Sequence, residues 1–168
     1  MAKIIGIGGA SRSGKSSLAK KLKDHYASKR VVILDQDDFV KPDEQLPTIQ
    51  DRLDWEHPDS IDLKALLAEI TSATKTYDLI IVEGILALYF EELNALYDFT
   101  IFIKISKPDF IFRRQQETRW GAEPNWYLEH VWTSHLVFGQ YLSPDLILSG
   151  ENEFQESSFE ELIRKINC

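Results

Sequence analysis

The stretch Gly9-Ala10-Ser11-Arg12-Ser13-Gly14-Lys15-Ser16 fits the pattern G-x-x-x-x-G-K-[ST] at every fixed position, and this pattern predicts a loop that binds the phosphates of a nucleotide. In such a loop the glycines let backbone N–H groups close around anionic oxygens, the lysine reaches the outer phosphates, and the final hydroxyl binds Mg²⁺. The competing interpretation is an ordinary turn rich in glycine and serine. The residues on either side of the stretch decide between the two.

These flanking residues predict a strand before the loop and a helix after it. The run Lys3-Ile4-Ile5-Gly6-Ile7 is short, apolar and β-branched, as a buried strand is. Apolar residues then recur at helical spacing, namely Leu18, Ala19, Leu22 and Tyr26. A helix that begins at the loop adds the partial positive charge of its N-terminus. This order favours the phosphate-binding interpretation, and we predict a phosphotransferase.

The composition suits one domain in a reducing compartment. The chain has 168 residues, of which 43% are hydrophobic, enough to bury a core. Its single cysteine, Cys168, cannot form an intramolecular disulfide, and we therefore expect the cytoplasm. No apolar run approaches the roughly 20 residues of a membrane span, and the N-terminus enters a strand directly instead of a signal peptide. We expect no membrane partner.

The charge balance argues against nucleic acid as a partner. Lys and Arg total 19 against 27 Asp and Glu, which gives a net charge of -8 and disfavours a broad surface for a polyanion. A small anionic ligand would instead need a local cluster of positive charge. The candidates for this cluster are Arg12, Lys15, Arg113, Arg114 and Arg119.

Further apolar runs predict the rest of a sheet. They are Val31–Leu34, Tyr77–Val82, Phe99–Ile105 and Leu146–Leu148. Helical patterns separate these runs, and Ser60 is the expected N-cap of the helix that follows it. We therefore predict an α/β fold in a single domain, residues 1–168, with a doubly wound, five-stranded and mainly parallel sheet and helices on both faces.

Acidic residues follow two of the predicted strands. The sequence Asp35-Gln36-Asp37-Asp38 ends one strand, and Glu83-Gly84 ends another. Because ligands bind beyond the carboxyl ends of parallel strands, these acids should lie beside the phosphate-binding loop. Glu83 would hold Mg²⁺, directly or through water, together with the hydroxyl of Ser16. The alternatives are an acidic turn at residues 35–38 and a helix-capping role for Glu83.

The segment from Val40 to Ser60 predicts an extended binding loop. It has no helical periodicity and contains three prolines. Trp55 within it has two open interpretations, packing as a surface anchor or stacking on a ligand. His57 has no partner at metal-ligand spacing, and we expect a structural role for it.

Arginines and aromatic residues mark the second half of the chain. A helix opened by Pro108 is expected to carry Arg113, Arg114 and Arg119, whose guanidinium groups either grip phosphate oxygens or form a solvated face. Most of the aromatic residues that follow should pack a helix on the sheet, with one or two left for a ligand; they are Trp120, Trp126, Tyr127 and Trp132. His130 and His135 are five residues apart, a spacing that does not suit an i, i+4 zinc pair.

Taken together, these features resemble the uridine kinase and nicotinamide riboside kinase family of phosphate-loop nucleoside kinases. The elements that carry the resemblance are the phosphate loop, Asp35-Gln36-Asp37-Asp38-Phe39, Trp55-Glu56-His57-Pro58-Asp59, Glu83-Gly84, the arginine-bearing helix and His130-Val131-Trp132. The phosphate loop alone is widespread. Its combination with the D-D-F and H-P-D elements is typical of far fewer families.

The resemblance implies transfer of the γ-phosphoryl group of ATP, with Mg²⁺, to the 5′-hydroxyl of a ribonucleoside. Asp37 would accept or orient the hydroxyl proton, and Lys15 would neutralise the transferring phosphates. Ser16 and Glu83 would hold the metal ion. The implied ATP-binding residues are Gly9, Ser11, Ser13, Gly14, Lys15, Ser16, Ser17 and Arg114.

The resemblance also implies a lid and a nucleoside site. Arg119, together with Arg114, would lie in a lid at about residues 108–125 that covers the phosphates. Glu56 stands where the family usually has an aspartate that binds the ribose hydroxyls. The glutamate side chain is one methylene longer than that aspartate. The implied partners are a small nucleoside and ATP. On physical grounds, Trp55 and Trp120 are candidates to sandwich the flat base.

The identity of the nucleoside rests on conflicting elements. D-Q-D-D-F and H-V-W look more like the nicotinamide riboside branch, whereas H-P-D looks more like the uridine branch. Because a cationic pyridinium gains from two indole faces, we favour nicotinamide riboside over uridine or cytidine. The alternatives are a kinase for another small alcohol, such as pantothenate or a phosphorylated sugar, and a regulator that binds ATP without transferring phosphate. Asp37 argues against the regulator, which needs no acid at the γ-phosphate.

Overall fold

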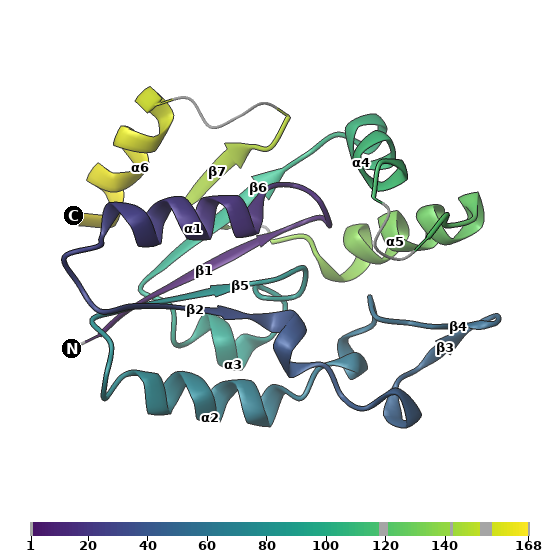
Figure 1. Cartoon of the computed structure of the whole chain (residues 1–168), viewed down its shortest axis with the longest axis horizontal. Coiled ribbons are helices and arrows are strands. Elements are labelled where there is room, and N and C mark those ends of the chain that lie inside the picture. Colours follow the sequence, from purple (N-terminus) through teal and green to yellow (C-terminus); the bar gives the residue numbers. More distant parts are fainter. Residues whose placement is uncertain (1, 118–120, 142, 152–155, 168) are drawn as a thin grey trace.

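A parallel β-sheet forms the centre of the fold (Figure 1). The computed structural model describes residues 2–117, 121–141, 143–151 and 156–167. Within them the main sheet has five strands in the order β2-β5-β1-β6-β7, all paired in parallel. The strands are β1 (Lys3–Gly9), β2 (Val31–Asp35), β5 (Leu79–Glu83), β6 (Phe99–Lys104) and β7 (Leu146–Ser149). The predicted doubly wound α/β fold is confirmed.

Helices cover both faces of the sheet because the side chains of its strands alternate between two cores. Ile5 and Ile7 pack with α1 (Lys15–His25) and α6 (Glu156–Asn167) on one face. Ile4 packs on the other face, where α2 (Leu63–Ala73) and α3 (Glu91–Asn94) contribute their apolar side chains; the two helices contribute Leu66, Ile70 and Leu93. No helix in the described residues is long and apolar enough to cross a membrane.

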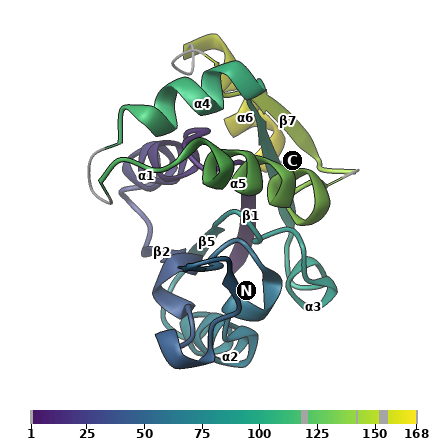
Figure 2. The same cartoon turned by 90° about the vertical axis from the view of Figure 1, so that its right-hand side faces the viewer.

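Two further helices and a loop lie beyond the carboxyl ends of the strands. The helices α4 (Lys107–Gln115) and α5 (Asn125–Phe138) share a small core around Phe110, Tyr127 and Val131. Figure 2, which faces this end of the molecule, shows α4 and α5 on one side and the segment of residues 40–60 on the other. The carboxyl ends of the strands therefore lie between a pair of helices, α4 and α5, and the segment of residues 40–60.

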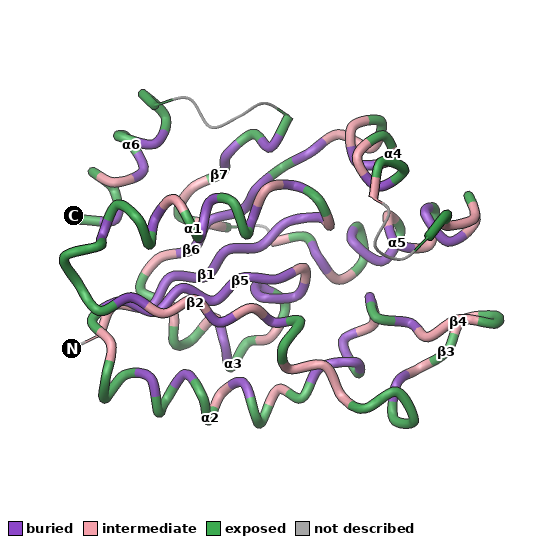
Figure 3. The backbone as a smooth tube through the Cα atoms, viewed as in Figure 1, coloured by how far each residue is buried: buried purple, intermediate pink, exposed green. Residues whose placement is uncertain are grey.

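The segment of residues 40–60 contains no α-helix, as predicted, but it is more ordered than the expected loop. Two short strands, β3 (Thr48–Ile49) and β4 (Arg52–Leu53), pair in antiparallel fashion. Figure 3 shows that these strands lie largely outside the buried centre. Two-residue strands are too short to produce a periodic pattern, which is why the sequence did not predict them. The 3₁₀ turns η1 (Gln36–Phe39), η2 (Asp43–Gln45) and η3 (Pro58–Ser60) complete the connection.

The N-cap predicted at Ser60 is wrong. Helix α2 begins at Leu63, and the carboxylate of Asp62 caps it by accepting the backbone N–H of Ala65 at 3.0 Å. The Ser60 hydroxyl instead donates to the carbonyl of Trp55 at 3.1 Å. Both residues are good caps, but Ser60 is fully buried in the preceding 3₁₀ turn, and its hydroxyl ties that turn to the residue 40–60 segment.

Candidate active site

The loop of residues 9–16 joins β1 to α1, as the motif predicts, and two of its glycines are required by geometry. Gly9 has a φ of 147°, and a Cβ atom there would lie 2.5 Å from the carbonyl oxygen of Ile103. Gly14, the N-cap of α1, has a φ of 105°, in the left-handed region that favours glycine. Gly9 therefore lets the loop pass close to the backbone of β6, and Gly14 lets the chain turn into α1.

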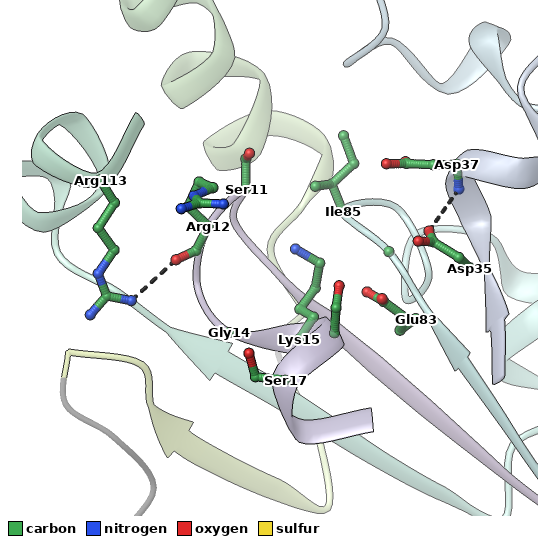
Figure 4. Close-up of a pocket in the computed structure, with 12 residues that line it drawn as sticks. Ser11, Arg12, Gly14, Lys15, Ser17, Asp35, Asp37, Glu83, Ile85 and Arg113 are labelled. Carbon is green, nitrogen blue, oxygen red and sulfur yellow. Dashed lines mark hydrogen bonds between the residues drawn. The ribbon is translucent and has the colours of Figure 1, made fainter. Parts of the chain in front are cut away.

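Polar groups of this loop suit an anionic ligand. The buried Lys15 ammonium group donates to the carbonyl of Ala10 at 2.9 Å, and Figure 4 shows it directed into the cavity above the loop. Burial lowers the pKa of Lys15, and Glu83 is the strongest of the carboxylates that oppose this shift. The Ser13 hydroxyl is buried and has no hydrogen-bond partner among the described residues. A triphosphate would supply partners for both groups.

The loop forms one wall of a cavity of about 410 Å³. Cationic side chains line the part nearest α4, and carboxylates line the opposite part at the ends of β2 and β5 (Figure 4). Its lining residues are Ser11, Arg12, Gly14, Lys15, Ser16, Ser17, Asp35, Asp37, Glu83, Gly84, Ile85 and Arg113. The structure thus brings most of the predicted ATP-binding residues to one cavity.

The predicted magnesium ligands are neighbours in this cavity. The Ser16 hydroxyl is hydrogen-bonded to the carboxylate of Glu83, and Asp35 stands opposite Glu83 in the register of β2 and β5. Burial raises the pKa of Glu83, and the Ser16 hydrogen bond opposes this effect. Hydroxyl and carboxylate oxygens are the ligands that Mg²⁺ prefers, with water and phosphate completing its shell. The donor set of Ser16 and Glu83 therefore fits Mg²⁺.

A second cavity of about 340 Å³ adjoins the first. Its lining residues are Ser11, Gln36, Asp37, Val40, Arg52, Trp55, Glu56, Ile61, Ile85, Arg114, Glu123 and Tyr127. Three residues, Ser11, Asp37 and Ile85, line both cavities. Asp37 is accessible to solvent through these openings, yet partial desolvation by the surrounding protein and the nearby Asp35 raise its pKa. A carboxyl group thus stands where the two cavities meet.

Glu56 and Trp55 extend from the residue 40–60 segment into the second cavity. Glu56 is 7% exposed, and burial raises its pKa to about 7 even though the charge of Arg114 favours its ionised form. Trp55 is 43% exposed, so that its indole ring both lines the cavity and meets solvent. The structure brings these two predicted substrate-binding residues to the same cavity as Asp37.

The arginines of α4 divide between the two cavities. Arg114, predicted at the phosphates, lines the second cavity and contacts the phosphate-binding loop: Glu123 accepts two hydrogen bonds from it at 2.6 and 3.0 Å, and the Ser11 hydroxyl accepts one at 2.6 Å. Arg113 lines the first cavity and donates to the carbonyls of Arg12 and Glu151. Successive residues on a helix point about 100° apart, which places the two guanidinium groups on different sides.

The remaining predictions have mixed outcomes. Arg119 and Trp120 lie outside the described residues. His57 accepts the backbone N–H of Asp59 at 3.1 Å and caps η3, in agreement with the structural role expected for it. Sequence reasoning missed Arg52 and Glu123 as cavity residues, because Arg52 lies in the two-residue strand β4 and Glu123 in the connection between α4 and α5, and neither has a motif around it.

Comparison with known proteins finds two kinds of kinase. The chain is 31% identical over 137 residues to a uridine kinase of Geobacillus kaustophilus (strain HTA426), a match that covers 66% of this chain and 64% of that protein. It is 25% identical over 154 residues to nicotinamide riboside kinase 1 of Homo sapiens, covering 82% of this chain and 76% of that protein. The chain thus spans less than two thirds of the length of that uridine kinase. No protein-family profile matches it.

A solved structure shares the fold. The structure of a possible uridine kinase from Bacillus stearothermophilus matches with a TM-score of 0.58 at 16% identity, covering 88% of each chain. Similarity at this level of identity concerns the fold. Sequence and structure together confirm that this chain resembles the uridine kinase and nicotinamide riboside kinase family and has the fold of the phosphate-loop kinases.

Proposed function

We propose that this chain is a nucleoside kinase that transfers the γ-phosphoryl group of ATP to the 5′-hydroxyl of a ribonucleoside, with nicotinamide riboside favoured over uridine or cytidine. The observation that carries the proposal is the pair of adjoining cavities, one built around a phosphate-binding loop, with Asp37 in the wall that they share. The names of the relatives, uridine kinase and nicotinamide riboside kinase, support the same class of reaction.

The first cavity would hold the phosphate donor. Mg-ATP supplies the phosphoryl group when it is bound, and Ser16 and Glu83 would hold the metal ion. Lys15 would turn from the Ala10 carbonyl to the outer phosphates and neutralise charge there. Arg113 lines the same cavity on the side away from the carboxylates, and it would add a second cation.

Asp37 would orient the acceptor hydroxyl in the shared wall. Its carboxylate accepts the hydroxyl proton as the oxygen attacks phosphorus and the bond to the leaving ADP oxygen breaks. Because the transition state of phosphoryl transfer is loose, alignment of the hydroxyl contributes more than the strength of the base. The raised pKa of Asp37 suits a group that takes up a proton during the reaction.

The second cavity would hold the nucleoside. Glu56 would accept hydrogen bonds from the ribose hydroxyls, and Trp55 would stack on the base. Three carboxyl groups line this cavity against two guanidinium groups; they are Asp37, Glu56 and Glu123 against Arg52 and Arg114. The indole of Trp55 in the same cavity supports a cationic base such as the pyridinium of nicotinamide riboside, because a cation is attracted to an aromatic face.

We further propose one domain over residues 1–168 with a substrate-binding segment and an arginine-bearing lid. The segment of about residues 40–60 would bind the nucleoside, since Trp55 and Glu56 belong to it. The segment of about residues 108–125, which includes Arg113 and Arg114, would act as a lid over the transferring phosphates.

ADP release from Mg-ATP tests the proposal against a panel of nicotinamide riboside, uridine, cytidine, adenosine and pantothenate. We expect release with the nucleosides and the highest kcat/KM with nicotinamide riboside. Activity with pantothenate alone would replace the nucleoside assignment by another alcohol kinase. Tight ATP binding with no release for any acceptor would favour the regulator, and a higher kcat/KM for uridine would reverse the stated preference.

A further inference from the structure

Two side chains behind the second cavity connect helix α5 to the residue 40–60 segment. His130 of α5 and Asp54 approach to 2.9 Å between Nε2 and Oδ1, and their side chains are 19% and 10% exposed. Neither belongs to the residues that line the two cavities. The catalytic and substrate-binding roles proposed above therefore give no role to the contact between His130 and Asp54.

The same carboxylate oxygen also contacts the backbone of a cavity residue. Asp54 Oδ1 accepts the backbone N–H of Glu56 at 3.2 Å. The N–H of Asp54 in turn donates to the carbonyl of Pro47 at 2.7 Å, which closes the β3–β4 hairpin behind it. Asp54 is thus fixed on both sides, and its carboxylate bridges the ring of His130 to the backbone of Glu56.

A second contact joins the same face of α5 to the same segment. The guanidinium group of Arg52 lies over the ring of Tyr127, 5.0 Å from its centroid. Tyr127 and His130 are three residues apart on α5, so they project from one face, and their ring centroids are 6.1 Å apart. One helical face therefore holds the segment at two points, on either side of Leu53 in the chain.

We propose that His130 is a positioning residue for the acceptor site: through Asp54 it fixes the backbone of Glu56, and thereby the Glu56 carboxyl group, at the wall of the second cavity. This inference rests on the proposed function, in which Glu56 binds the acceptor. His130 does not touch the acceptor or the phosphates. Loss of its hydrogen bond should therefore weaken acceptor binding and leave the phosphate donor site unchanged.

Steady-state kinetics of His130→Ala test this role. We expect the acceptor KM to rise about tenfold, with kcat and the ATP KM within about twofold of the wild type. His130→Gln, whose amide nitrogen stands near the position of Nε2, should recover part of the loss. The matched control is Glu129→Ala, because Glu129 is exposed on the same helix and pairs with Lys107 on α4. An unchanged acceptor KM in His130→Ala, or an equal rise in the ATP KM, would overturn the proposal.

Asp54→Asn supplies a second route in case His130→Ala perturbs the packing of α5. This variant should raise the acceptor KM in the same way. Combining Asp54→Asn with His130→Ala should give an increase smaller than the product of the two separate increases, because both changes remove the same contact. Fully multiplicative effects would show that the two side chains act separately and would contradict the bridge.

Amide hydrogen exchange measures the bridge without any activity. In His130→Ala we expect faster exchange in a peptide covering residues 52–57 and unchanged exchange in α2. If the wild-type protein phosphorylates no acceptor, the proposed function fails, whereas faster exchange would still establish that His130 fixes this segment. Unchanged exchange at residues 52–57 would overturn the inference, whether or not the protein is a kinase.

Discussion

Asp37 occupies the wall shared by the two cavities, and its raised pKa reflects partial desolvation and the nearby Asp35. For the proposed kinase we expect Asp37→Asn to lower kcat by about 10² to 10⁴, since an amide cannot accept the hydroxyl proton. The Kd of Mg-ATP, measured by calorimetry, should change little. Asp38→Asn is the matched control, as Asp38 is exposed and lines neither cavity. Undiminished turnover would remove Asp37 from this role.

Glu56 gives a prediction about stability and pH. Burial raises its pKa from 4.5 to about 7 in the folded protein; Arg114 and Lys15 favour its ionised form, whereas Asp54 and Asp37 oppose it. Between pH 4.5 and about 7 the folded state holds a proton that the unfolded state releases, so Glu56 makes stability fall as pH rises through this window. The loss is complete above about pH 7 and corresponds to about 3 kcal/mol.

Glu56→Gln removes this titration, and chemical denaturation at several pH values measures the result. The wild type loses stability between about pH 4.5 and 7, and the variant lacks this loss. The free energy of unfolding of the variant minus that of the wild type should therefore increase with pH in this window. The difference between the two free energies of unfolding reports the contribution of Glu56 alone, because the other carboxyl groups with raised pKa values are present in both proteins. Parallel profiles for Glu56→Gln and the wild type would contradict the raised pKa.

At the scale of elements, the residue 40–60 segment carries Trp55 into the second cavity with 43% of its surface exposed. We expect Trp55→Ala to raise the nucleoside KM about tenfold, because stacking of an aromatic side chain on a base contributes about 1–3 kcal/mol. Trp55→Phe should retain part of this effect, and the ATP KM should stay constant. A nucleoside KM unaffected by Trp55→Ala would identify Trp55 as a surface anchor.

The strands and the phosphate-binding loop were predictable from local sequence. Buried parallel strands need continuous apolar runs, and the loop needs glycine at positions 9 and 14, where the φ angles are 147° and 105°. The β3–β4 hairpin and the N-cap at Asp62 were missed. The two-residue strands of the hairpin are too short to give a periodic pattern, and the choice between Ser60 and Asp62 as the cap is made by tertiary contacts, as the burial of Ser60 shows.

The residues of the candidate site were predictable only where they lie at the carboxyl end of a parallel strand or in the phosphate-binding loop. Lys15, Asp37 and Glu83 stand at strand ends or in the loop, so parallel topology alone brings them to one rim. Arg52 belongs to the two-residue strand β4 and Glu123 to the connection between α4 and α5, and only the folded chain brings the two side chains together. The orientation of Arg114 toward the second cavity likewise depended on the rotation of α4, which its sequence pattern does not fix.

For the whole molecule, a single domain should unfold in one cooperative thermal transition. Mg-ATP at about 100 times its Kd should stabilise the folded state by about 2.7 kcal/mol and raise Tm by about 5–10 °C. Calorimetry with and without the ligand measures the shift, and chelation of Mg²⁺ should reduce it. Lys15→Ala should abolish most of it. Two separate transitions, or no shift with Mg-ATP in the wild type, would contradict the single nucleotide-binding domain.

The wall shared by the two cavities has a consequence for inhibitor chemistry. Since Ser11, Asp37 and Ile85 border both spaces, the terminal phosphate of a donor and the primary alcohol of an acceptor would lie against the same three residues in the proposed kinase. One molecule in which a polyphosphate chain tethers adenosine to the acceptor would therefore fill both chambers at once. Its affinity would benefit from tethering the two halves, because the second half binds at a high effective concentration once the first is seated.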